Sequence, residues 1–308
     1  MKICALSDLH GNLPQLEPCD VVCICGDIAP INFDRSTDRC IYWFRTVFLK
    51  WCSELECEKV IFIAGNHDFF LDLLGNKTIF IIEEYELENK VIYLENSEYV
   101  YNNVRFYGCP NVENLAHWAY YTPDGMEYRH IPENTDVLLT HMAPKIGEIG
   151  RDLTVIRDFG SLRLAKSITS NRKIKYAFCG HIHDGDHTPH FVNDTTLVNV
   201  AILNDDYEIA YNPFYTELIL LPNRYNDHNF FIFQNKDDDN LYNFKLVLEN
   251  NLGHRIIGEN EAFDPSGGPF IGLGYNIQYQ GKDLQLINFD ASTLIFTFQE
   301  YAKDKEIT

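Results

Sequence analysis

The chain has 308 residues, 45% of them hydrophobic, which provides enough apolar material for a sizeable core and excludes a disordered chain. Its formal net charge of −20 argues against a long nucleic-acid groove, because such a groove needs lysine and arginine to displace counterions. No apolar run reaches the roughly 18 residues of a membrane helix. The first residues already read as a strand, so we expect neither a signal segment nor a membrane partner.

Five apolar runs in the first two thirds of the chain each stop abruptly at a polar cluster. Continuous apolar runs of this length are typical of strands that are buried on both faces. In open α/β sheets, ligands gather beyond the carboxyl ends of the strands, so we expect the five clusters to meet. The runs are residues 2–6, 21–25, 60–64, 137–139 and 176–179, and the clusters that follow them contain Asp8 and His10, Asp27, Asn66 to Asp68, His141, and His181 to His183.

The segments between these runs predict helices and a hairpin. Apolar residues recur at helical spacing over residues 39–55 and 161–170. Residues 99–107 resemble two short strands that turn at Asn102 and Asn103. Residues 110–133 are aromatic, polar and rich in proline and glycine, which predicts a long loop.

The composition changes after about residue 222, where a polar break at residues 223–228 opens a new region. We therefore predict one domain over residues 1–221 and a small β-rich region over residues 222–308. Within the second region we expect strands at residues 230–233, 244–248 and 293–298, a Gly/Pro-rich loop at 264–274, and a solvated turn at 237–239.

Nine cysteines are present, an odd number, and nothing indicates secretion. We expect free thiols in a reducing compartment, and therefore a cytoplasmic protein. Four of them lie inside the apolar runs and should pack as small hydrophobic side chains: Cys4, Cys23, Cys25 and Cys179.

Five histidines follow the predicted strands: His10, His67, His141, His181 and His183. Packing alone gives no reason to collect so many costly polar groups at one end of a sheet. Oxygen and nitrogen ligands from Asp, Asn and His suit manganese, iron and zinc. With one shared carboxylate the set divides into two shells of about four ligands, an arrangement that can clamp a phosphoryl group between two metals.

The ordered motifs resemble the full signature of the calcineurin-like metallophosphoesterases. They are Asp8-x-His10, Gly26-Asp27, Gly65-Asn66-His67-Asp68, Thr140-His141 and Gly180-His181-x-His183. The segments between them, such as residues 117–120, 160–162, 180–185 and 197–199, resemble the MPPED-like, brain 239-type branch over about residues 1–221. This resemblance implies an α+β fold, a four-layer αββα sandwich of two mixed sheets flanked by helices, to which the C-terminal region is an extension.

The resemblance also implies a role for each motif residue. Asp8, His10 and His183 would bind one divalent metal ion, and Asn66, His141 and His181 a second, with Mn²⁺, Fe²⁺/Fe³⁺ or Zn²⁺ as the candidates. Asp27 would bridge both ions. His67 would protonate the leaving oxygen of the substrate, and Asp68 would orient His67.

The function that follows is that of a metal-dependent phosphoric ester hydrolase. The favoured reaction is attack by a metal hydroxide on a small phosphodiester, with cyclic nucleotides as the leading substrates. The alternatives are a phosphomonoesterase, acting on protein or small molecules, and a catalytically idle metal-binding scaffold. The protein Ser/Thr phosphatase branch is disfavoured, because Gly26-Asp27 continues as Ile28-Ala29-Pro30 and not through the Asp-Arg-Gly element of that branch.

Three residues outside the motifs leave alternatives open. Trp118 could stack on a nucleobase or simply pack its loop onto the core. His187 and His190 follow the last motif closely and could extend the site, but we expect them in a surface loop.

Overall fold

The computed structural model describes residues 1–33, 35–220, 229–236, 241–248, 261–263, 270–271, 273, 276–290 and 295–300. The chain divides into two compact units. The first comprises Met1–Val192 and Thr196–Thr216, and the second comprises Asn193–Thr195 and Glu217–Thr308. The polar break at residues 223–228, the turn at 237–239 and most of the loop at 264–274 lie outside the described residues, so the boundary after residue 221 stays a prediction.

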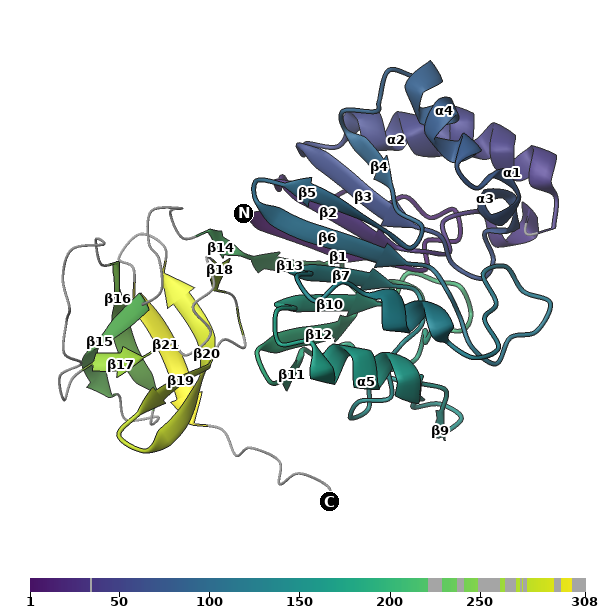
Figure 1. Ribbon diagram of the computed structural model, residues 1–308. Coiled ribbons are helices and arrows are strands. Elements are labelled where there is room, and N and C mark those ends of the chain that lie inside the picture. Colours follow the sequence, from purple (N-terminus) through teal and green to yellow (C-terminus); the bar gives the residue numbers. More distant parts are fainter. Residues whose placement is uncertain are drawn as a thin grey trace. The chain divides into compact units, whose positions relative to one another are not determined.

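The first unit contains two sheets (Figure 1). One has the strand order β13 (Phe214–Glu217), β1 (Lys2–Leu6), β2 (Val21–Cys25), β3 (Lys59–Ile63), β4 (Val91–Tyr93). Strands β1 to β4 are parallel to one another, and β2 is buried along its whole length. The predicted strands at residues 2–6 and 21–25 are confirmed with the same bounds. Cys4, Cys23 and Cys25 are fully buried in this sheet, as expected of small hydrophobic side chains.

The second sheet has the order β11 (His190–Val192), β12 (Thr195–Asn199), β10 (Tyr176–Cys179), β7 (Val137–Thr140), β6 (Val104–Cys109), β5 (Ser97–Tyr101). Strands β6, β7, β10 and β12 are parallel to one another, and β5 is antiparallel to β6. Both residues of the tight turn between β5 and β6, Asn102 and Asn103, have positive φ (49° and 63°). That geometry is typical of a two-residue hairpin, so the predicted turn is confirmed.

Helices cover the outer faces of the two sheets (Figure 1). On the first sheet lie α1 (Thr37–Trp43), the π-helical η2 (Phe44–Phe48), α2 (Leu49–Glu54), α3 (Phe69–Leu74) and α4 (Lys77–Glu84); η1 (Ile31–Phe33) precedes α1. On the second lie α5 (Leu162–Ser170) and the short η3 (Met126–His130). The inner faces pack together, since Cys25 Sγ lies 3.6 Å from the carbonyl oxygen of Phe178. The four-layer αββα sandwich is thus confirmed.

Two helical predictions need adjustment. The helix expected over residues 39–55 runs from Thr37 to Glu54 and contains the π-helical segment in its middle. The loop expected over residues 110–133 contains η3, which its proline and glycine content concealed. The helix expected over residues 161–170 is confirmed as α5, and the Ser161 side chain caps it by accepting a hydrogen bond from the Leu164 N–H.

The second unit contains a closed barrel of antiparallel strands. The order is β15 (Asn229–Lys236), β16 (Tyr242–Leu248), β21 (Ile295–Glu300), β20 (Lys282–Asp290), β19 (Asn276–Tyr279), β17 (Glu261–Phe263). Phe244, Phe296 and Phe298 are buried in its interior. The β-rich character of this region is confirmed, although the strand expected at residues 293–298 begins, among the described residues, at Ile295.

Two short ladders lie outside these sheets and the barrel. Strand β14 (Ile219–Leu220) pairs with β18 (Phe270–Ile271), and β8 (Arg151–Asp152) pairs with β9 (Arg157–Asp158). None of the helices in the described part of the chain is both long enough and apolar enough to span a membrane.

Candidate metal centre

The five polar clusters meet beyond the carboxyl ends of β1, β2, β3, β7 and β10. Carboxylate and imidazole atoms form three groups in which all atoms lie within 4.8 Å of one another: Asp8, His10 and His183; His10, Asp27 and His67; Asp8, Asp27 and His141. Asn66 joins them through its Oδ1, which lies 3.0 Å from His141 Nε2. The His181 ring lies 5.1 Å from the His141 ring. The structure therefore brings together all seven residues expected to bind metal, with His67 beside them.

Strained backbone brings these side chains to face one another. Asp8, His10, Asp27 and His181 all have positive φ (56°, 42°, 51° and 72°). Residues other than glycine adopt this left-handed conformation at a cost, and such strain is concentrated at functional sites. Four strained residues at the ends of three strands turn the chain sharply inward, which extended backbone could not do.

Two glycines allow the carboxylates to approach the neighbouring backbone. A Cβ atom at Gly65 would lie 2.2 Å from Asp27 Oδ1, and one at Gly180 would lie 2.3 Å from Asp8 Oδ2. Any side chain at either position would therefore displace a carboxylate from the centre.

Backbone carbonyls orient two of the histidines. The Nδ1 atom of His141 lies 2.8 Å from the Cys25 carbonyl oxygen, while its Nε2 lies 3.3 Å from Asp27 Oδ2. His183 repeats the arrangement, with Nδ1 3.1 Å from the Asn204 carbonyl oxygen and Nε2 3.2 Å from Asp8 Oδ1. A carbonyl at Nδ1 that directs Nε2 inward is the usual support of a metal-binding histidine.

The two central carboxylates are stabilised as anions. Burial alone would raise the pKa of Asp8, but the hydrogen bond from His183 and the charges of His141 and His183 outweigh it and hold the pKa below its usual value. Burial likewise opposes ionisation of Asp27, whose pKa is nevertheless lowered, chiefly by His141. In return, and against their own burial, the pKa values of His141 and His183 are raised to about 9 by Asp27 and Asp8.

His10 shows that a cation fits between these groups. Burial lowers the pKa of His10 to about 4, so its ring is neutral at physiological pH. Both of its ring nitrogens are buried, and neither has a hydrogen-bond partner among the described residues. Buried polar atoms normally have partners. One of these nitrogens, Nε2, lies 3.6 Å from Asp27 Oδ2. A divalent cation bound between them would provide a partner for this nitrogen and for the carboxylate oxygen.

Asp68 supports the turn that carries His67. The Asp68 carboxylate accepts hydrogen bonds from the backbone N–H groups of Gly65 (2.8 Å), Ile28 (3.1 Å) and Ala29 (3.1 Å). Burial, together with the charge of Asp27, raises its pKa to about 7. The His67 N–H donates to Asp27 Oδ1 at 2.8 Å, so the same turn is also tied to the central carboxylate.

Sequence reasoning missed one residue that contacts the centre, Tyr207. The ring of Tyr207 lies 4.9 Å from that of His10 and 5.4 Å from that of His183. His187 lies in a loop, as predicted, but it is half-buried, and its ring stacks 3.6 Å from that of Tyr211. Its Nε2 lies 2.9 Å from the carbonyl oxygen of His183, so it supports the segment that carries this ligand. Positive φ at Tyr207 (61°) marks it as unusual, but no sequence motif does.

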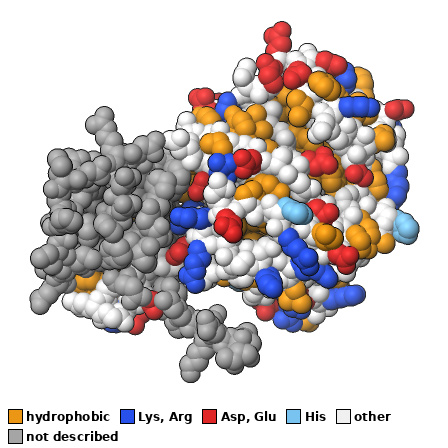
Figure 2. Space-filling model, viewed as in Figure 1, with side chains coloured by type: hydrophobic (Ala, Val, Ile, Leu, Met, Phe, Trp, Pro, Cys, Tyr) orange, Lys and Arg blue, Asp and Glu red, His pale blue; other side chains and the backbone are white. Residues whose placement is uncertain are grey.

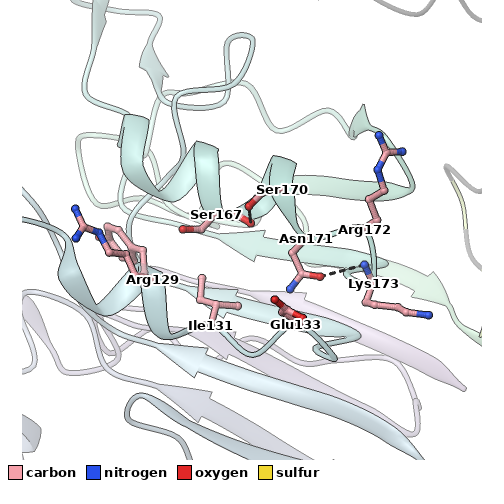
Figure 3. A pocket seen from close by; sticks show the side chains of 9 residues that line it. Arg129, Ile131, Glu133, Ser167, Ser170, Asn171, Arg172 and Lys173 are labelled. Carbon is pink, nitrogen blue, oxygen red and sulfur yellow. Dashed lines mark hydrogen bonds between the residues drawn. The ribbon is translucent and has the colours of Figure 1, made fainter.

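A surface cavity of about 490 Å³ lies elsewhere in the first unit (Figure 3). Its lining comes from η3, the end of α5 and the segment after it, where the Lys173 N–H donates to Asn171 Oδ1. Figure 2 shows lysine and arginine side chains gathered on this part of the surface. None of the residues expected to bind metal or to act in catalysis lines this cavity, so it is separate from the site described above.

Comparison with known proteins agrees with the site. The profile of the calcineurin-like phosphoesterase family matches residues 1–185. Metallophosphoesterase domain-containing protein 1 of Homo sapiens is 25% identical over 240 residues, which cover 70% of this chain and 71% of that protein. A UPF0046 protein of Caenorhabditis elegans is 27% identical over 232 residues (70% and 79% covered). A dimetal phosphatase from Danio rerio aligns with a TM-score of 0.40 at 10% identity, over 70% of this chain and 91% of that one.

Proposed function

Because this chain belongs to the calcineurin-like phosphoesterase family, we propose that it is a metal-dependent phosphodiesterase that hydrolyses cyclic nucleotides or other small phosphodiesters. The family consists of dinuclear metal-dependent phosphoric ester hydrolases, and its profile covers all five motifs of the centre. The observation that carries the proposal is the convergence of five ligand-type side chains on two buried carboxylates, Asp8 and Asp27.

The proposed ligand sets are those that the motifs imply, and the first of them is one of the observed groups. Asp8, His10 and His183 would hold one ion, and Asn66, His141 and His181 the other. Asp27 Oδ2 lies 3.6 Å from Nε2 of His10, a ligand of the first set, and 3.3 Å from Nε2 of His141, a ligand of the second, which supports its role as the shared ligand. When bound, two divalent cations draw charge from the phosphoryl oxygens and make water a stronger nucleophile. Manganese, iron and zinc all suit this donor set.

His67 is the proposed proton donor to the leaving oxygen. Although its ring lies 4.9 Å from that of His10, its side chain is partly exposed, whereas His10 and His141 are buried. A donor must reach the substrate, and the partial exposure of His67 next to the buried carboxylates allows this. Asp68 would act on His67 through the backbone of the turn that both share.

Two aromatic side chains favour a diester over a monoester. Trp118 contacts His67, with ring centroids 4.5 Å apart, and Tyr207 contacts His10 and His183. Each is partly exposed, and they meet different histidines of the centre. A phosphodiester carries two organic arms, one for each of these surfaces, whereas a monoester carries only one.

The test is hydrolysis of two chromogenic esters by the full chain after reconstitution with Mn²⁺, Zn²⁺ or Fe²⁺. We expect bis-p-nitrophenyl phosphate to be cleaved with a kcat/KM at least about tenfold above that for p-nitrophenyl phosphate, a difference of about 1.4 kcal/mol in barrier. Faster cleavage of the monoester would contradict the diesterase proposal. Cleavage of neither ester, despite bound metal, would indicate a scaffold without activity. A panel of cyclic nucleotides and linear diesters would then identify the substrate class.

A further inference from the structure

Two aromatic rings connect the proposed proton donor to an exposed cation. The Trp118 ring lies 4.5 Å from that of His67 and 5.9 Å from that of Phe69. Phe69 begins α3, directly after the motif that contains His67, so both rings stand on a segment fixed by the centre. We call Phe69 and Trp118 the aromatic shelf.

Arg35 lies on this shelf. The centre of its guanidinium group is 4.3 Å from the Phe69 ring centroid and 5.3 Å from that of Trp118. Both distances are within the range of cation–π attraction. The side chain is exposed, and no ion pair between described residues involves it. A guanidinium that rests on rings is held in place while its N–H donors remain available to an anion.

We propose that Arg35 forms an anion subsite on the leaving-group side of His67. The preferred substrate is then a phosphate ester whose departing group carries a second anionic group, a carboxylate or a phosphate. This inference rests on the proposed function, because His67 defines the leaving-group side. Arg35 and His67 both contact the Trp118 ring, so the distance between them is bridged by a departing group of modest length.

The position of Arg35 favours the departing group over the reacting phosphate. Arg35 contacts the Trp118 ring, and this ring contacts His67, so one aromatic ring separates Arg35 from the proposed proton donor. The other aromatic surface has the opposite charge, because exposed Asp205, Asp206 and Glu208 surround Tyr207 in its loop. An anionic arm is therefore repelled from the Tyr207 side and attracted to the Arg35 side. This arrangement also makes Trp118 a support for Arg35, in addition to a surface for the substrate.

Arg39 provides a matched control. It is also exposed, and its guanidinium lies 4.0 Å from the centroid of a ring, that of Phe33. No ring contact between described residues joins Phe33 to a histidine of the centre. Replacing Arg39 therefore removes the same charge from the same region without touching the shelf.

The experiment compares paired ligands that differ in one charge. The substrates are aryl methyl phosphates whose departing phenol bears a carboxylate in the meta position, or the neutral carboxamide. The corresponding benzylphosphonate methyl esters, which cannot lose the aryl arm, report binding alone by calorimetry. All are measured with the metal-loaded full chain, its Arg35→Gln variant and its Arg39→Gln variant, whose folding is checked by thermal denaturation.

The unaltered chain and Arg39→Gln should prefer the carboxylate by about fivefold in kcat/KM and Kd, as expected of an exposed ion pair. The preference should shrink at high salt, since salt screens exposed charges. The Arg35→Gln variant should lose the preference for the carboxylate substrate, yet cleave the carboxamide within about twofold of the original rate. The Arg35→Lys variant should keep part of this preference, because lysine retains the positive charge but lacks the planar guanidinium group.

Three results would overturn the subsite: no preference in the unaltered chain, a preference that survives in Arg35→Gln, or an equal loss in Arg39→Gln. A different result would count against the phosphodiesterase alone. If neither substrate is cleaved but the phosphonates still show the Arg35-dependent preference, the subsite stands and the proposed reaction falls.

Discussion

Metal binding should release protons, because two proposed ligands carry protons that a metal ion must displace. In the metal-free protein the pKa values of His141 and His183 are about 9, raised by Asp27 and Asp8, so both rings are cationic at neutral pH. The pKa values of His10 and His181 are lowered to about 4, mainly by burial, so these rings are already neutral. Histidine binds metal only in its neutral form.

The expected magnitude follows from these values. At pH 8, about nine tenths of each cationic ring is protonated, so full metal loading should release about 1.8 protons per chain. At pH 10 the figure should fall to about 0.2. Asp68, whose pKa is raised to about 7, is mostly ionised at pH 8 and adds little. Since a raised histidine pKa favours the metal-free form in acid, metal affinity should increase with pH up to about 9 and then level off.

The number of protons released can be measured by calorimetric titration of chelator-treated protein with Zn²⁺. The titration is repeated in buffers that differ in ionisation enthalpy. The His183→Asn variant should release about one proton fewer, because one cationic ring is gone. Release of less than about half a proton at pH 8, or an affinity that does not change between pH 7 and 9, would refute the reasoning. Titration of the histidine ring signals by NMR in the metal-free protein gives an independent check.

Three further predictions concern the centre and its boundaries. Asp27→Ala should lose both metal ions and all activity, because its carboxylate lies beside a proposed ligand of each ion, His10 and His141. Metal analysis that finds both ions still bound would contradict this. His67→Ala should keep its metal while turnover falls about 10²–10⁴-fold, with a smaller deficit for a good leaving group such as p-nitrophenolate. Equal deficits for good and poor leaving groups would mean that His67 is not the acid. A fragment of residues 1–222 should fold, bind two metal ions and cleave an activated diester at a rate within about tenfold of that of the full chain. If the fragment is insoluble or binds no metal, residues 223–308 are part of the catalytic fold.

Local patterns in the sequence were sufficient for the strands that end at the site and for the types of ligand that follow them. Strands β1, β2 and β10 have the predicted bounds, because a parallel strand buried on both faces must be apolar at every position. The polar residues that follow could be recognised for a related reason. Each cluster directly follows an apolar run. Burying polar side chains at the end of such a strand costs free energy unless they bind a partner or a ligand.

Pairing within the site was decided only by the tertiary structure. Asp8 meets His183, which is 175 positions away in the chain, and Asp27 meets His141. These contacts depend on how one sheet packs on the other, which no local pattern encodes. The same is true of Arg35 on its aromatic shelf and of Tyr207 beside His10, since neither belongs to a motif.

The second unit shows the same division. Its short apolar runs indicated strands, but closure into a barrel depends on the pairing of β15 with β17, and of β17 with β19, which are separated along the chain. The sequence by itself thus determined which residues form strands and which chemical groups end them, because these depend on neighbours along the chain. The tertiary structure decided which groups face one another, because that depends on the packing of segments that the sequence keeps far apart.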